Sequence, residues 1–175
     1  MDFKIALQKL ANAFDSEKID YMLVGGFATA FYNKYRYTAD IDCVIQMHPH
    51  QVPKIVKHFP DWKWAEDGFI ENARKGIVFN FTDFESAIKI DFMLYQDSDY
   101  NWEAFKRRRK VNYYDIETYV SAKEDLIISK LMWYNISQSG KQMEDIKFLL
   151  KLDNLNMDYI RGWTTRLLIK THGLF

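Results

Sequence analysis

Apolar residues recur along this 175-residue chain at two spacings that predict different secondary structures. Strict alternation of apolar and polar residues predicts half-buried strands, whereas apolar residues three and four positions apart predict amphipathic helices. Alternation predicts five strands, at residues 21–24, 41–45, 77–81, 87–94 and 111–114. The third and fourth strands are joined directly by a short segment, which predicts a hairpin and therefore a mixed sheet.

Helical spacing marks the start of the chain, the run after Gly25-Gly26 and the whole C-terminal part. Ser121 and Glu124 have the spacing of a capping box, so a helix is predicted to begin near Ala122. Two further helices are predicted beyond a break at 138–140. We therefore predict an α/β fold with a mixed-sheet core over residues 1–120 and a C-terminal helical segment over residues 121–175.

Two aspartates interrupt the second predicted strand. Asp40 and Asp42 share its polar row with Arg36 and Thr38, opposite an apolar row that includes Cys43. Two residues of strand rise place the Cα atoms of the aspartates about 6.6 Å apart, so their carboxylates repel each other by roughly 2–3 kcal/mol at an effective dielectric near 20. A divalent cation such as Mg²⁺, which prefers carboxylate oxygens, would relieve this repulsion.

Asp91 is the lone acid on the less apolar face of the fourth predicted strand, in the run Lys89-Ile90-Asp91. If that strand neighbours the second one, Asp91 completes a three-carboxylate metal site with Asp40 and Asp42. The sequence alone does not establish this pairing. Asp-x-Asp pairs are also common on solvated strand faces, so this second interpretation stays open.

The pair Gly25-Gly26 stands between a predicted strand and a predicted helix. Glycine lets an anion approach the backbone, and the free amides at a helix N-terminus favour a phosphate. The pattern is neither a Walker A loop nor Gly-x-Gly-x-x-Gly. An ordinary turn is the alternative.

Lys130 lies on the same predicted helical face as Leu126, Trp133 and Tyr134. A lysine on such a face either contacts a bound anion or extends along the packed surface to reach water. The aromatic side chains either pack in the core or stack on a nucleobase, which makes Tyr134 a candidate nucleotide contact.

Composition predicts one compact protein, since 48% of the residues are apolar and 17% are aromatic. With 24 Lys and Arg against 24 Asp and Glu, any contact with RNA must be local, and the basic run 106–110 is its candidate. A solvated helix end is the other interpretation of that run. The single cysteine and the lack of a long apolar segment predict a cytoplasmic protein without a membrane span.

Three blocks of the chain together resemble the nucleotidyltransferase superfamily. They are GGFATAFYNKYRYTADIDCVI, FNFTDFESAIKIDFML and KEDLIISKLMWYNISQSGKQMEDIKFLL. The branch that they most resemble is that of bacterial proteins related to the AbiEii-type toxins of toxin–antitoxin systems. The resemblance extends from about Asp20 to about Trp163 and keeps the order of the blocks.

The resemblance implies roles for individual residues. Asp40, Asp42 and Asp91 would bind two Mg²⁺ ions, and Gly25 and Gly26 would contact the triphosphate of a nucleoside triphosphate. Lys130 would contact a phosphate, and Asp145 would either orient this lysine or pack the helical lid. A surface acid on a helix is the other interpretation of Asp145. Arg36, Thr38 and Tyr134 are further candidates for nucleotide binding. One departure is Gly26, since the superfamily often has serine there.

The activity implied is transfer of a nucleoside monophosphate to a hydroxyl of RNA or of a protein, with pyrophosphate as the leaving group. A toxin-like regulator with an antitoxin partner is the implied context. The alternative is a catalytically silent protein of the same fold that binds a nucleotide or a partner.

Overall fold

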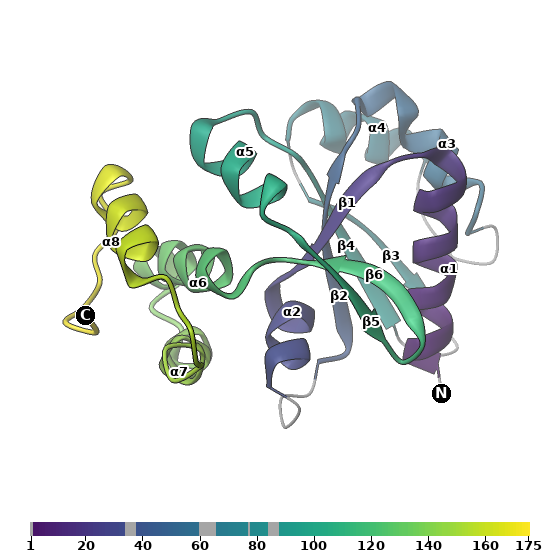
Figure 1. Ribbon diagram of the computed structural model, residues 1–175. Coiled ribbons are helices and arrows are strands. Elements are labelled where there is room, and N and C mark those ends of the chain that lie inside the picture. The colour runs from purple at the N-terminus through teal and green to yellow at the C-terminus, as the bar shows by residue number, and fades with distance from the viewer. Residues whose placement is uncertain (1, 34–37, 60–65, 77, 84–87) are drawn as a thin grey trace.

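The computed structural model describes residues 2–33, 38–59, 66–76, 78–83 and 88–175 (Figure 1). Its elements in chain order are α1 (Asp2–Glu17), β1 (Asp20–Val24), α2 (Gly25–Tyr32), β2 (Asp40–Gln46), the 3₁₀ turn η1 (Pro49–Gln51), α3 (Val52–Val56), α4 (Glu66–Arg74), β3 (Phe79–Asp83), β4 (Ile88–Leu94), α5 (Asp99–Lys106), β5 (Arg109–Tyr113), β6 (Ile116–Val120), α6 (Lys123–Ser137), α7 (Gly140–Leu149) and α8 (Met157–Arg166).

Six strands form one sheet in the order β3-β4-β2-β1-β6-β5. The pairs β2/β4 and β1/β6 are parallel, and the other three pairs are antiparallel. The predicted mixed α/β fold is therefore confirmed. The antiparallel pairing of β3 and β4 is the predicted hairpin, although its connection at residues 84–87 lies outside the described residues.

The sequence prediction missed β6. A two-residue turn joins it to β5, and both residues of that turn, Tyr114 and Asp115, have positive φ angles of 53° and 65°. Such turns are usually marked by Asn-Gly or Asp-Gly, and this one contains no glycine. The sequence therefore lacks the glycine-containing turn that would have indicated a hairpin of β5 and β6.

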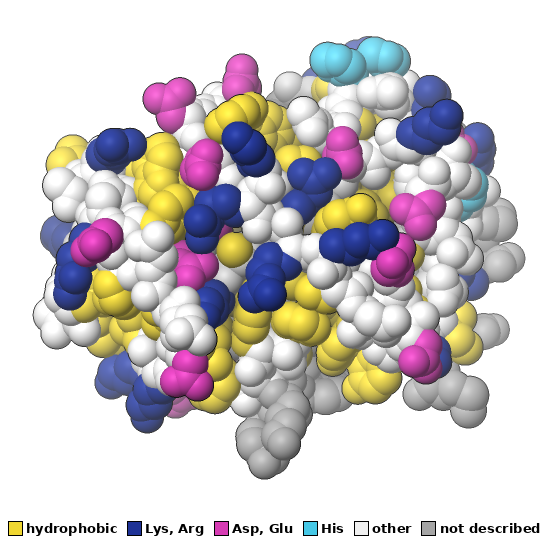
Figure 2. Space-filling view, in the orientation of Figure 1, with side chains coloured by type: hydrophobic (Ala, Val, Ile, Leu, Met, Phe, Trp, Pro, Cys, Tyr) yellow, Lys and Arg dark blue, Asp and Glu magenta, His cyan; other side chains and the backbone are white. Residues whose placement is uncertain are grey.

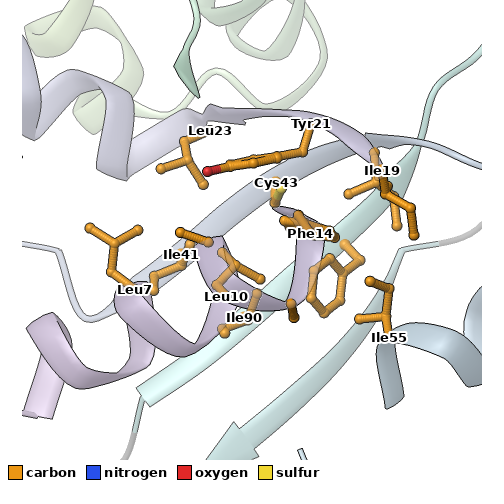
Figure 3. Close-up of a cluster of buried hydrophobic side chains, with 14 of the residues drawn as sticks. Leu7, Leu10, Phe14, Ile19, Tyr21, Leu23, Ile41, Cys43, Ile55 and Ile90 are labelled. Carbon is orange, nitrogen blue, oxygen red and sulfur yellow. The ribbon is translucent and has the colours of Figure 1, made fainter. Parts of the chain in front are cut away.

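One face of the sheet packs against α1 and α3 (Figure 1). Leu7, Leu10 and Phe14 of α1 meet the apolar rows of β2 and β4, and Cys43 is buried among them (Figure 3). Because alternate strand residues point to opposite faces, burying Ile41, Cys43 and Ile45 turns the intervening aspartates toward the other side of the sheet.

Helix α2 packs against β1 and β2 and contacts α6, and α7 and α8 pack on α6 to one side of the sheet (Figure 1). Buried residues of α5, α6, α7 and α8 form a separate apolar cluster that also takes in Ala28 of α2. The predicted capping box is wrong, because Ala122 is the N-cap of α6 and no side chain caps it. The Ser121 amide instead donates to the Leu23 carbonyl at 2.9 Å, extending the pairing of β6 with β1.

Candidate active site

Three carboxylates and one lysine lie on the exposed face of the adjacent strands β2 and β4. The strands are parallel in a register that puts Asp42 opposite Asp91 and Asp40 opposite Lys89. Asp40 is exposed, whereas Asp42 and Asp91 are partly buried. The neighbouring-strand arrangement that the sequence left open is therefore the one observed.

The turn between β1 and α2 lies directly against Asp42. Gly25 has a φ angle of +58°, which is the left-handed region that glycine adopts without strain. Gly26 follows in the first turn of α2 and donates its backbone N–H to Asp42 Oδ2 at 3.0 Å. The Gly25-Gly26 pair thus places a helix N-terminus beside the carboxylates, where an anion and its counter-ion could be bound together.

Asp42 is partly buried and lies close to other negatively charged side chains. Burial raises the pKa of this carboxyl, and the charges of Asp91 and Asp40 raise it further. The hydrogen bond from Gly26 and the positive charge of Lys130 act in the opposite direction. Asp42 therefore has a surplus of negative charge around it, which a bound cation would relieve.

Asp91 is held by one of its two oxygens. Lys89 Nζ donates to Asp91 Oδ2 at 2.8 Å, and this hydrogen bond raises the pKa of Lys89. Asp91 Oδ1 is buried and has no hydrogen-bond partner among the described residues. A buried carboxylate oxygen without a partner is costly, unless a ligand such as a cation binds it.

The residues present fit a divalent metal in their chemistry. Carboxylate oxygens are the donors that Mg²⁺ prefers, and Asp42 and Asp91 offer them from directly opposite positions. As the side chains stand, however, no three His, Cys, Asp or Glu residues in the described part of the chain converge closely enough to share one ion. Asp40 in particular is turned toward solvent.

Lys130 of α6 is almost fully buried, with 4% of its side chain exposed. Its ammonium donates to Asp145 Oδ2 of α7 at 2.8 Å and to Gln142 Oε1 at 3.2 Å. The expected pairing of Asp145 with this lysine is thus observed. Because a buried lysine needs a partner to stay charged, Asp145 and Gln142 of α7 stabilise the positive charge of Lys130.

A cavity of about 410 Å³ lies between the sheet and α6. Gly25, Gly26, Asp42, Asp91 and Lys130 all contribute to its wall. The remaining wall is largely apolar along β1, β2 and β4, and it meets polar groups from α5, α6 and α7. These further lining residues are Met22, Val24, Val44, Val78, Met93, Tyr100, Asn101, Ala104, Ser121, Asp125, Ser129, Trp133 and Gln142.

Of the other three predicted nucleotide contacts, one is not described, one lies beside the glycine turn and one lies away from the cavity. Arg36 falls outside the described residues. Thr38 lies beside the turn, where its Oγ1 would be 2.9 Å from a Cβ added to Gly26. Tyr134 does not line the cavity, and its ring instead contacts His172 edge to face with centroids 4.9 Å apart.

Trp133, which the sequence offered with Tyr134 as a residue that either packs in the core or stacks on a base, lines the cavity with 56% of its surface exposed. Sequence reasoning passed over other groups near the carboxylates. Tyr100 and Asn101 enter from α5, and no local pattern marks them, because only the packing of α5 against α6 and α8 brings them there. Lys89 did carry a signal, since it is two residues before Asp91 on the same strand face.

The basic run 106–110 is largely engaged in contacts within the chain. Arg107 forms ion pairs with Glu124 and Asp125, Arg108 pairs with Asp20, and Lys110 pairs with Glu117. Figure 2 shows lysines and arginines interspersed with acids on one face of the molecule, rather than gathered in one patch. These contacts favour the interpretation of the run as part of a folded surface over its interpretation as an RNA-docking patch.

None of the helices in the described part of the chain combines the length and the apolar character that a bilayer span requires.

The solved structures that this chain resembles have nucleotidyltransferase folds. The antibiotic-resistance factor ANT(2″)-Ia, in complex with adenylyl-2″-tobramycin, has a TM-score of 0.60 and 12% identity, over 96% of this chain and 98% of that one. An antigenic nucleotidyltransferase-like protein from Paracoccidioides brasiliensis has a TM-score of 0.57 and 18% identity, over 92% and 87%. The lincosamide antibiotic adenylyltransferase LnuA has a TM-score of 0.50 and 14% identity, over 80% and 91%.

At these identities the likenesses establish the fold. No curated protein sequence matches the chain. The AbiEii-type branch expected from the sequence stays a prediction, whereas the wider superfamily is confirmed. Residues 3–166 match the family described as "Nucleotidyltransferase of unknown function (DUF6036)", and the chain belongs to this family.

Proposed function

We propose that this protein is a Mg²⁺-dependent nucleotidyltransferase that moves a nucleoside monophosphate from a nucleoside triphosphate to an acceptor hydroxyl. The single observation that carries the proposal is the pairing of Asp42 with Asp91 across β2 and β4, beside the Gly25-Gly26 turn and on the wall of one cavity. The carboxylates suit a metal ion, and the helix N-terminus and the lysine suit the phosphate groups of a triphosphate.

The chain's own groups have separate tasks in this proposal. Backbone amides at the start of α2, other than that of Gly26, which donates to Asp42, bind phosphate oxygens and compensate for the lack of a serine at Gly26. Lys130 contacts a phosphate from the opposite wall, while Asp145 and Gln142 hold its ammonium in place. Asp42 and Asp91 hold the cation, which when bound neutralises phosphate charge and aligns the triphosphate for attack.

The acceptor is a hydroxyl of RNA or of a protein in the prediction from sequence. Two proteins of similar fold suggest a third class of acceptor, the small hydroxyl compounds, because ANT(2″)-Ia is seen with adenylyl-2″-tobramycin and LnuA with lincomycin. A cavity of about 410 Å³ is within the usual size range of small-molecule sites. A small hydroxyl compound therefore joins RNA and protein as a candidate acceptor.

We further propose that residues 1–120 act as the catalytic core and that residues 121–175 form a helical subdomain, which supplies Lys130 and Trp133 to the cavity. A cytoplasmic toxin-like role with an antitoxin partner remains our proposal for the biological context. It rests on the resemblance of the three sequence blocks to the AbiEii-type proteins.

A catalytically silent nucleotide-binding or partner-binding protein is the second candidate. The contacts of the carboxylates favour it, because Asp42 Oδ2 already accepts from Gly26 and Asp91 Oδ2 already accepts from Lys89. Both contacts must be compatible with a bound cation for catalysis to occur.

The deciding experiment incubates the protein with Mg²⁺ and each α-labelled nucleoside triphosphate. Cell RNA, protein extract and a panel of aminoglycoside and lincosamide hydroxyl compounds serve as acceptors. The control is the Asp40→Ala and Asp42→Ala double variant. Label that enters one acceptor class only with the wild-type protein would establish the transferase. Nucleotide binding without any transfer would favour the silent candidate, and no binding would refute the assignment of these residues to a nucleotide site.

A further inference from the structure

Lys89 stands inside the carboxylate cluster. On the exposed face of β2 and β4, four side chains form two facing rows, with Asp40 and Asp42 on one strand and Lys89 and Asp91 on the other. Lys89 is directly opposite Asp40, and its ammonium is 2.8 Å from Asp91 Oδ2. One corner of this square of side chains is therefore a lysine that pairs with Asp91.

We propose that Lys89 takes the place of a second divalent cation, so that the site binds one metal ion rather than two, and that it positions Asp91 for that ion. The proposal deepens the proposed function and rests on it. It departs from the two Mg²⁺ ions expected from the resemblance, and it assigns Lys89 as a positioning residue.

Formal charge supports a single ion. Three carboxylates and one ammonium leave two negative charges on this face, which one divalent cation neutralises. Without the lysine, three negative charges would remain, and one divalent cation would leave an excess. A second divalent ion would meet the positive charge of both the first ion and the Lys89 ammonium on the same small face, and like charges at such distances repel strongly.

The hydrogen bonds that the carboxylates already accept also favour a single ion. Lys89 donates to Asp91 Oδ2 and Gly26 donates to Asp42 Oδ2, while Asp91 Oδ1 is buried without a partner in the described structure. Two facing carboxylates that each have one oxygen engaged suit one shared ion better than two.

The test is to count Mn²⁺ ions bound per chain at saturating triphosphate analogue with an uncleavable α–β bridge. Free Mn²⁺ is measured by electron paramagnetic resonance and corrected for the analogue alone. We expect one ion for the wild type and for Lys89→Arg, and two for Lys89→Met. Paired ions lie about 3.5–4 Å apart and couple magnetically, so only Lys89→Met should show a coupled spectrum.

Lys110→Met is the matched control, because it also removes a strand lysine from an ion pair, with Glu117, but far from the cavity. It should bind one ion. Two coupled ions in the wild type, or one ion in a folded Lys89→Met, would overturn the role of Lys89 and leave the proposed function standing. No ion in any variant would overturn both. If Lys89→Met does not fold, the wild-type count and spectrum still decide.

Discussion

Gly25 lies so close to Asp42 that no side chain fits between them. A Cβ atom built on Gly25 would be 2.6 Å from Asp42 Cγ and closer still to its Oδ2. The φ angle of +58° independently disfavours any other residue. The turn that ends β1 thus has two reasons to be glycine, one in the backbone and one in the position of a candidate metal-binding carboxylate.

Gly25→Ala should therefore lower stability and nucleotide transfer together. Left-handed backbone costs an ordinary residue about 1–2 kcal/mol, and displacement of Asp42 adds to this. We expect urea denaturation to show the first effect and single-turnover rates to show the second. Gly76→Ala is the control, since Gly76 has a φ angle of +67° but faces only the flexible side chain of Gln96. Equal loss of transfer in both variants would contradict the contact with Asp42.

Asp42→Asn should separate catalysis from folding. Burial and neighbouring acids raise the pKa of Asp42, so removal of its charge relieves repulsion, while the amide oxygen still accepts from Gly26. We expect an unchanged or higher Tm, and transfer reduced by more than the roughly 10–100-fold typical of residues outside the metal's own ligands. The exposed Asp97→Asn is the control and should change neither. A marked fall in Tm for Asp42→Asn would refute this electrostatic account.

Much of this arrangement could be predicted from the alternation of side chains. Polarity along β2 and β4 was enough to place Asp40, Asp42 and Asp91 on the face away from the core, because a strand has a period of two. The register that sets Asp42 opposite Asp91 depends on strand order, and the chain does not encode that order locally. Parallel neighbours come from segments far apart in sequence, so only the fold could reveal them.

Helical spacing was a weaker guide to the cavity. It grouped Lys130, Trp133 and Tyr134 on one face, but the packing of α7, α8 and the C-terminal residues divides that face. Tyr134 turns toward His172, whereas Trp133 is left at the cavity. Likewise Ser121 looked like a helix cap, yet its amide completes a sheet contact. Tertiary packing outweighed local preference in each case.

Trp133→Ala should weaken nucleotide binding without weakening the fold. The indole lines the cavity and is 56% exposed, so its removal leaves little buried space unfilled. Stacking of a base on an aromatic ring contributes about 1–3 kcal/mol, which predicts a rise in the nucleotide Kd of roughly 5–150-fold. Titration of nucleotide by calorimetry measures this directly. Ile136→Ala, on the same helix but 77% exposed and outside the cavity lining, should leave the Kd unchanged.

Arg107→Met should destabilise the protein more than any other single loss in the basic run. The guanidinium donates to Glu124 and Asp125 at 3.0 Å each, and these acids are 7% and 2% exposed. Burial already raises the pKa of Asp125, and Arg107→Met removes the cation that pairs with both acids. Removing one partner of a buried ion pair costs about 3–5 kcal/mol, and the partial exposure of Arg107 places the expected loss near the lower value.

Urea denaturation of Lys110→Met provides the comparison for this last change. Its ion pair with Glu117 is more than half exposed on both sides, so the loss of stability should be small. Tyr159 should widen the difference in stability loss between the two variants, because it depends on Arg107 as well. Its hydroxyl donates to Asp125 Oδ1, and the Arg107 guanidinium lies 4.0 Å from the centre of its ring. Arg107 therefore ties α8 to the start of α6. If the two variants lost equal stability, Arg107 would be an ordinary surface cation and its availability for RNA would have to be reconsidered.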